Sequence, residues 1–223
     1  MSPVRTGGLM AKMDEYLLNE MENSNSHLKK ETRINRKIIF SDEYVRAIQS
    51  IGESKECSRL IIEAIRKMIK HHDGDSFEDL YFIDSESNIC KSQTNYRVEH
   101  KVEPTVAMLK MLTDNPNIIA IHNHPNSMLP SLSDFYICRN RKYKYGMIAC
   151  HNGNVYLYKV IGGLVDIIIE TSIRIYERKE LISLTSLNDA NEILISHQEH
   201  INELIKNLYD AGIELKEVFY NER

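Results

Sequence analysis

The chain has 223 residues, of which 42% are hydrophobic and 27% are charged, and its formal net charge is -4. This balance is typical of a globular protein with a buried core, arranged in one domain or at most two small ones. The acidic charge argues against a protein that mainly coats nucleic acid, because such proteins usually carry a basic surface.

The cysteines and the apolar runs indicate the compartment. Cys57, Cys90, Cys138 and Cys150 form no C-x-x-C pair, and most lie in apolar stretches. They resemble the reduced thiols of a cytosolic protein more than a disulfide framework. The N-terminus has no apolar signal region, and the longest apolar runs, such as 163–169, are too short to cross a bilayer. We therefore expect a cytoplasmic protein without a membrane partner.

The first half of the chain is predicted to be mainly helical. Apolar residues at helical spacing and local turn signals place the boundaries. In chain order, the expected elements are an amphipathic helix over 9–22, a polar linker to residue 36, a strand over 38–40, a helix from the Ser41 cap to about 50, a helix over 55–70, strands over 80–84 and near Ile89, and a helix over 104–114 with Pro104 in its first turn.

The second half mixes strands and helices. The expected elements are a strand over 117–121, a helix over 132–142, strands over 146–151 and 154–160 that meet at Asn152-Gly153, a strand over 164–170, and a long helix over 187–211. The pattern predicts an α/β or α+β fold with additional helices at both ends.

One segment carries a metal-binding pattern. The apolar strand over 117–121 leads directly into His122 and His124, and residues two apart on a strand point to the same side. Pro125 turns the chain, and a helix then starts near Ser131 with Asp134 in its first turn. Two imidazoles and one carboxylate suit a tetrahedral zinc with one open position, where water can be activated. Ser131-x-x-Asp134 is also an ordinary helix-capping arrangement.

This segment resembles the JAMM zinc metalloprotease motif (the JAB/MPN family), H-x-H-P followed by S-x-x-D, and looks closest to bacterial, phage and RadC-type domains. The resemblance implies a JAB/MPN-like mixed sheet flanked by helices and one zinc per chain. The zinc ligands would be His122, His124 and Asp134, and Ser131 would stabilise the oxyanion. It further implies cleavage of peptide or isopeptide bonds in a protein substrate, including bonds at the C-terminus of ubiquitin-like modifiers. The spacer from Pro125 to Ser131 has five residues, one fewer than expected, which should tighten the loop.

The family also uses a glutamate from an earlier strand as the catalytic base. Glu78 is our choice, because it opens a predicted strand that precedes the histidine strand in the chain. Asp79 is adjacent but should face the other side of the strand. Glu63 is a rival within a helical pattern, and Glu43 and Glu99 are weaker candidates.

We divide the chain into a helical arm and linker (1–36), a JAB/MPN-like domain (37–175) and a C-terminal helical extension (176–223). The helix over 187–211 has a long apolar face, which can pack on its own domain or form a homodimer. Members of the family that bind a distal ubiquitin often carry an insertion after the aspartate, whereas only about a dozen residues separate Asp134 from the next predicted strand, so the resemblance implies an open groove beside the zinc. Substrate selection would then fall to the terminal helices.

Two other histidine pairs are expected to be structural. His197 and His200 lie three apart and suggest a solvated helix surface, while His71 and His72 follow a helix end, where cationic groups are favoured.

The alternatives to a hydrolase are a RadC-type protein acting in nucleic-acid processing or mobile-element biology, and a non-catalytic zinc-binding scaffold. An HNH nuclease is disfavoured because the catalytic residues of HNH nucleases are dispersed along their chains, whereas His122, Asn123 and His124 are consecutive.

Overall fold

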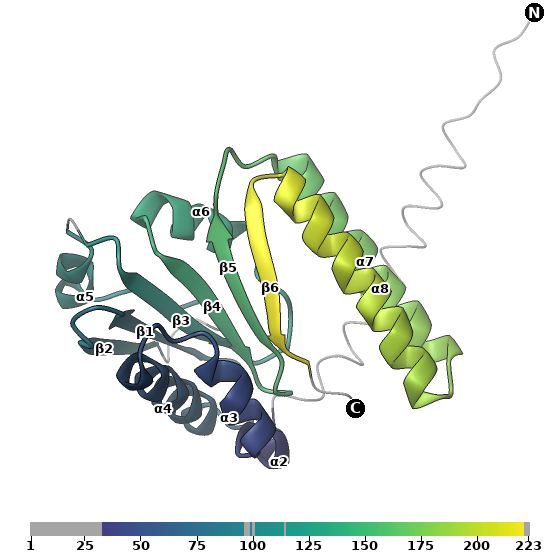
Figure 1. Ribbon diagram of the computed structural model, residues 1–223, viewed down its shortest axis with the longest axis horizontal. Helices are drawn as coiled ribbons and strands as arrows, with labels where there is room; N and C mark the ends of the chain where they lie inside the picture. The colour runs from purple at the N-terminus through teal and green to yellow at the C-terminus, as the bar shows by residue number, and fades with distance from the viewer. Residues whose placement is uncertain (1–32, 96–98, 100, 114, 221–223) are drawn as a thin grey trace, which may run out of the picture.

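The computed structural model describes residues 33–95, 99, 101–113 and 115–220. Within these residues the protein is a mixed α and β structure, with one six-stranded sheet covered by helices on both faces (Figure 1). The strands are β1 (Glu78–Asp84), β2 (Cys90–Asn95), β3 (Ile118–His124), β4 (Tyr145–Cys150), β5 (Val155–Val160) and β6 (Ile213–Phe219). The helices are α2 (Arg36–Ile39), α3 (Asp42–Gln49), α4 (Lys55–His71), α5 (Val106–Met111), α6 (Leu132–Arg141), α7 (Asp166–Ser186) and α8 (Ala190–Asp210).

The sheet has the strand order β2-β1-β3-β4-β5-β6. Only the central pair, β3 and β4, is parallel, and α6 connects these two strands. All other neighbours are antiparallel. The carboxyl end of β3 and the start of α6 therefore lie near the middle of the sheet, where ligand sites of α/β sheets usually form.

Two hydrophobic cores lie on opposite faces of the sheet. One contains residues of α5, α6, α7 and α8 together with Ile118 and Ala120 of β3. The other contains residues of α2, α3 and α4 together with Ile119 and Ile121. This alternation along β3 is the two-residue period of a strand that is buried on both sides.

Local sequence signals account for most of the helix starts. The hydroxyls of Ser41, Ser54 and Thr105 accept hydrogen bonds from backbone N–H groups three residues later and so cap α3, α4 and α5. The predicted helices over 41–50 and 55–70 are confirmed. The Asn152-Gly153 turn is also confirmed, with Gly153 at a positive φ of 107°. The predicted helix over 9–22 lies outside the described residues.

Three predicted elements differ from the structure, and one strand was missed. The strand over 38–40 is wrong, because Ile38 and Ile39 lie in α2 and Phe40 is its C-cap; the side chain of Asn35 caps the first turn of this helix. The strand over 164–170 is also wrong, because α7 begins at Asp166 and buries Ile169 against the core. Helix α5 is shorter than the predicted 104–114. Strand β6 was not predicted. Short apolar runs are ambiguous between helix and strand, and the packing partner decides.

The C-terminal elements are joined closely to the sheet. Helices α7 and α8 lie side by side along β6 (Figure 1), and β6 pairs with β5 from Val160↔Ile213 onward. The apolar face of α8 packs on its own domain through Ile201, Leu204 and Leu208. None of the helices in the described ranges is long and apolar enough to span a membrane.

His197 is buried between these elements, so its prediction as a solvated surface residue is wrong. Its Nδ1 lies 2.9 Å from Glu180 Oε2 on α7, and its Nε2 lies 3.0 Å from Glu217 Oε2 on β6. The ring of Tyr220 stacks on it at a centroid distance of 3.5 Å. A protonated imidazole can donate to both carboxylates and tie α8 to its two neighbours.

The charge on His197 should therefore influence stability. Burial opposes protonation of this imidazole, but the carboxylates of Glu180 and Glu217 outweigh burial and raise its pKa from 6.5 to about 9. A folded-state pKa above the unfolded value stabilises the fold fully below the unfolded pKa, and this contribution is lost as the pH rises through the folded pKa.

We expect His197→Gln to lower the free energy of unfolding by on the order of 2 kcal/mol near pH 6, and by much less near pH 10. Urea unfolding of both proteins at the two pH values measures the difference. A difference that is the same at both pH values would show that the charge of His197 contributes nothing.

Candidate metal centre

Strand β3 presents two histidines on one face. Leu80 pairs with His122 in the antiparallel register of β1 and β3, and His124 ends β3 two residues later. Both imidazoles therefore point to the side of the sheet that α6 covers. About a tenth of each side chain, 11% and 12%, remains exposed to solvent. The pair is thus held by a buried strand but open at one side.

The ligand atoms of three side chains converge at this point. His122 Nε2 lies 3.1 Å from His124 Nε2, and Asp134 Oδ1 lies 3.4 Å from His122 Nε2. Asp134 Oδ2 lies 3.9 Å from His124 Nε2. A tetrahedral zinc with bonds of ~2.0 Å spaces its ligand atoms about 3.3 Å apart. The three side chains therefore fit a zinc ion with little movement.

The orientation of His124 also suits a metal ligand. Its Nδ1 lies 2.9 Å from the carbonyl oxygen of Met128, to which a protonated Nδ1 donates. In a neutral imidazole this leaves the lone pair on Nε2, the atom that faces His122 and Asp134. Metal-binding histidines commonly have such a partner on the second nitrogen, which orients the ring and fixes the tautomer.

Asp134 is positioned by the first turn of α6. The backbone N–H and the hydroxyl of Ser131 both donate to Asp134 Oδ2, each at 2.7 Å. The Asp134 N–H donates in return to the Ser131 hydroxyl at 3.3 Å. This capping box occupies Oδ2 and leaves Oδ1 nearest to His122. The capping and ligand interpretations of Ser131-x-x-Asp134 are therefore compatible.

The loop before α6 packs against the hairpin of β4 and β5. The Ser127 N–H donates to the His124 carbonyl at 3.1 Å, and the Asn152 N–H donates to the Ser127 hydroxyl at 3.3 Å. Ser127 has a positive φ of 59°, which lets the five-residue spacer turn sharply. The short spacer thus still brings Asp134 to the two histidines.

Glu78 opens β1 on the same face as the two histidines. Continuing the register Leu80↔His122 by two residues sets Glu78 opposite His124. Only 6% of Glu78 is exposed. Burial raises its pKa to about 7; the nearby Asp134 carboxylate adds to this, and the His122 imidazole opposes it. A carboxyl group whose pKa lies near 7 can both accept and release a proton at neutral pH.

The charges of the ligands stabilise one another. Burial opposes charge on Asp134, but the His122 and His124 imidazoles hold the pKa of this carboxyl well below its usual range. Burial likewise opposes protonation of His122, yet Asp134 and Glu78 raise its pKa. Two carboxylates next to two imidazoles form an environment in which a cation is strongly favoured.

The rival carboxylates lie elsewhere. Glu63 is exposed on α4 and pairs with Arg59 at 2.9 Å, and Glu43 is exposed at the start of α3. Glu99 is exposed in a turn. Asp79 faces the opposite side of β1 from Glu78, as the strand period predicts, and contacts His71 and His72 at the C-terminal end of α4.

Two supporting groups were not anticipated from the sequence. One is the Met128 carbonyl, which no side-chain pattern marks. The other is Asn123, whose side chain lies on the reverse face of β3 and accepts a hydrogen bond from the Asp79 N–H at 2.8 Å. It also donates to the Phe77 carbonyl at 3.1 Å. The sequence signal that could have identified Asn123 is its position between two histidines on a predicted strand.

No protein-family model, curated protein or solved structure matches this chain.

We expect His122→Ala and Asp134→Ala each to lower bound zinc by about one ion per chain, because each removes one of three protein ligands. Elemental analysis after dialysis against buffered zinc measures the loss. Glu63→Gln, which changes an exposed carboxylate on α4, is the control and should keep its zinc. Unchanged zinc in both ligand variants would exclude this metal centre.

Ser131→Ala should lower the stability of the zinc-free protein by about 1 kcal/mol, because it removes the N-cap of α6. Ser131→Thr keeps the hydroxyl and should lose much less. Urea unfolding in the presence of a chelator measures both. Equal stability of the alanine variant and the parent would show that the capping bond does not support α6.

Proposed function

We propose that the protein is a zinc-dependent hydrolase of the JAMM type, with a JAB/MPN-like domain, that cleaves peptide or isopeptide bonds. The observation that carries the proposal is the convergence of His122, His124 and Asp134 with a buried Glu78 on the same face of the sheet. A zinc ion held there would supply a water of lowered pKa and a positive charge for a developing oxyanion.

Glu78 is the proposed general base. Its buried carboxylate, with a pKa of about 7, can take a proton from the attacking water and pass it to the leaving amine. The same residue favours an enzyme over a non-catalytic scaffold, since a structural metal site has no need of a buried second carboxyl group beside its ligands.

Ser131 has two proposed roles. Its hydroxyl donates to Asp134 Oδ2, so it orients a ligand in the resting state. The role of oxyanion donor, implied by the resemblance, requires this single hydroxyl proton to turn away from Asp134 toward the substrate. The backbone N–H of Ser131 would keep Asp134 in place during this change.

A protein substrate is favoured over a small molecule. The ligand side chains reach solvent, and β4 begins at Tyr145 soon after α6 ends at Arg141, so no insertion separates these elements. The exposed Met128 beside the histidines offers an apolar contact for an extended chain. The acidic net charge favours this reading over the nucleic-acid alternative.

Glu78→Gln should keep its zinc and lose on the order of 10²- to 10⁴-fold in hydrolysis rate. The assay follows new N-termini by mass spectrometry in a proteome-derived peptide library, with isopeptide-linked ubiquitin dimers as a second probe. Glu63→Gln is the matched control and should cleave like the parent. Full activity of Glu78→Gln would assign the base to another group. If the parent protein cleaves neither probe in a zinc-dependent manner, the proposal of a zinc hydrolase is contradicted.

A further inference from the structure

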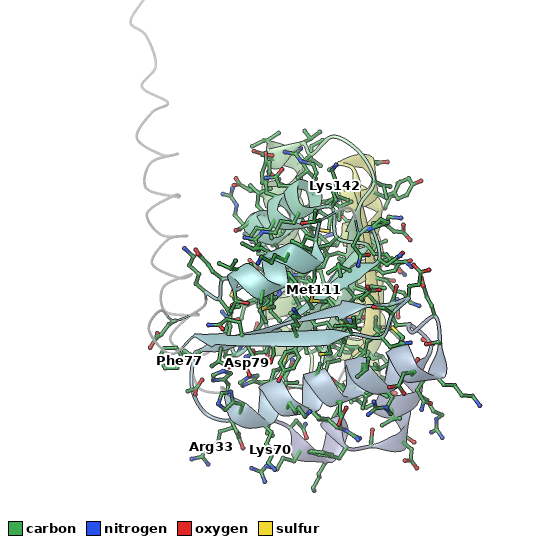
Figure 2. The ribbon with its side chains drawn as sticks, turned by 90° about the vertical axis from the view of Figure 1, so that its left-hand side faces the viewer. Arg33, Lys70, Phe77, Asp79, Met111 and Lys142 are labelled. Atoms are coloured by element: carbon green, nitrogen blue, oxygen red, sulfur yellow. The ribbon has the colours of Figure 1, made fainter. Side chains whose placement is uncertain are left out.

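A second cluster of metal-ligating groups lies on the other face of β1. His71 Nδ1 lies 3.0 Å from Asp79 Oδ2, and His72 Nε2 lies 3.0 Å from Asp79 Oδ1. One ligand atom from each of the three residues lies within 4.8 Å of the others. In Figure 2, Asp79 lies on the side of β1 that faces α4, near the end of that helix marked by Lys70. The cluster thus joins the end of α4 to the start of β1.

His72 lies between two carboxylates. It is fully buried, and both of its ring nitrogens face carboxylates. Its Nδ1 lies 3.0 Å from Asp75 Oδ1, and its Nε2 lies 3.0 Å from Asp79 Oδ1. A neutral imidazole has one N–H and can donate to only one of them. The other nitrogen would then face an oxygen with lone pairs on both sides, unless a proton or a metal ion lies between them.

The neighbours of the cluster hold it in the geometry of a metal site. A carboxylate such as Asp75 on the second nitrogen is the usual partner of a metal-binding histidine. Asp79 is anchored through its N–H, which donates to Asn123 Oδ1, and through its carboxylate, which accepts from the Thr94 hydroxyl. The arrangement therefore exists before any ion binds, which lowers the free-energy cost of binding.

The ligand types indicate which ion would bind. Two imidazoles and one carboxylate suit zinc and similar transition-metal ions, whereas calcium and magnesium prefer oxygen ligands. His72 and Asp79 are buried, but the His71 side chain is 41% exposed. This exposure leaves a path by which an ion can reach the cluster from solvent.

We propose that His71, His72 and Asp79 form a second site for a zinc-class divalent ion, with a structural role. The ion would bind the end of α4 to the start of β1, directly behind the first centre. The link between the two is Asn123, which contacts the Asp79 N–H from its place between His122 and His124 on β3. This site does not depend on the proposed hydrolase activity.

The competing explanation is a doubly hydrogen-bonded imidazolium at His72, held between Asp75 and Asp79 without any metal. Both explanations use the same contacts and differ only in whether the cluster takes up an ion. Metal binding must therefore be measured with the first centre removed.

The test uses the full chain carrying His122→Ala and His124→Ala. We expect this protein to retain about one zinc per chain after dialysis against buffered zinc, and to show a higher Tm with zinc than with chelator. Adding His71→Gln should weaken zinc binding by at least about tenfold. This substitution alters a half-exposed side chain, and circular dichroism checks that the fold is kept. The control is His200→Gln in the same background, which should bind zinc unchanged.

Two results would overturn the second site: the folded His122→Ala, His124→Ala protein binds no zinc, or its zinc binding is unaffected by His71→Gln. Either result would favour the imidazolium explanation for His72. These outcomes are separate from the hydrolase proposal, because the first centre is absent from every protein compared. Conversely, if the parent protein shows no hydrolytic activity, the zinc-binding test of the second site is unaffected.

Discussion

The alternation of side chains along β3 is the constraint on which the remaining structure depends. Strand β3 lies between β1 and β4 in the sheet, and helices cover both of its faces, so Ile118 and Ala120 enter one core and Ile119 and Ile121 the other. A slip of one residue in the register would move each apolar side chain to the wrong core. The same alternation sends the two histidines at its end to the α6 face and Asn123 to the α4 face.

The two faces at this end of the sheet are polar for related reasons. On one side, the candidate ligands of the metal centre lie beside Glu78; on the other, Asp79 lies among histidines of α4. The junction between them is a hydrogen bond between the Asp79 N–H and Asn123. Buried polar groups that are fully paired make their surroundings rigid. A site that needs well-aligned ligands benefits from such a support behind it.

The C-terminal part of the chain is coupled to the sheet in a similar manner. Strand β6 completes the sheet edge beside β5, and His197 joins α8 to Glu180 of α7 and Glu217 of β6. The apolar face of α8 is used within the domain. The outer face of α7 instead exposes Ile167 and Ile182.

The sequence by itself determined the helices that carry their own caps, the strand that delivers His122 and His124, and the opposite facing of Glu78 and Asp79. These features depend on neighbours within a few residues, or on the period of two along a strand. Only the tertiary structure decided that the runs over 38–40 and 164–170 belong to the end of α2 and the start of α7 and not to strands, because a short apolar run fits either state until its packing partner is known. It also decided the pairing of β6, the burial of His197 and the meeting of His71 with Asp79, since these contacts join residues distant along the chain or on different elements and no local pattern encodes them.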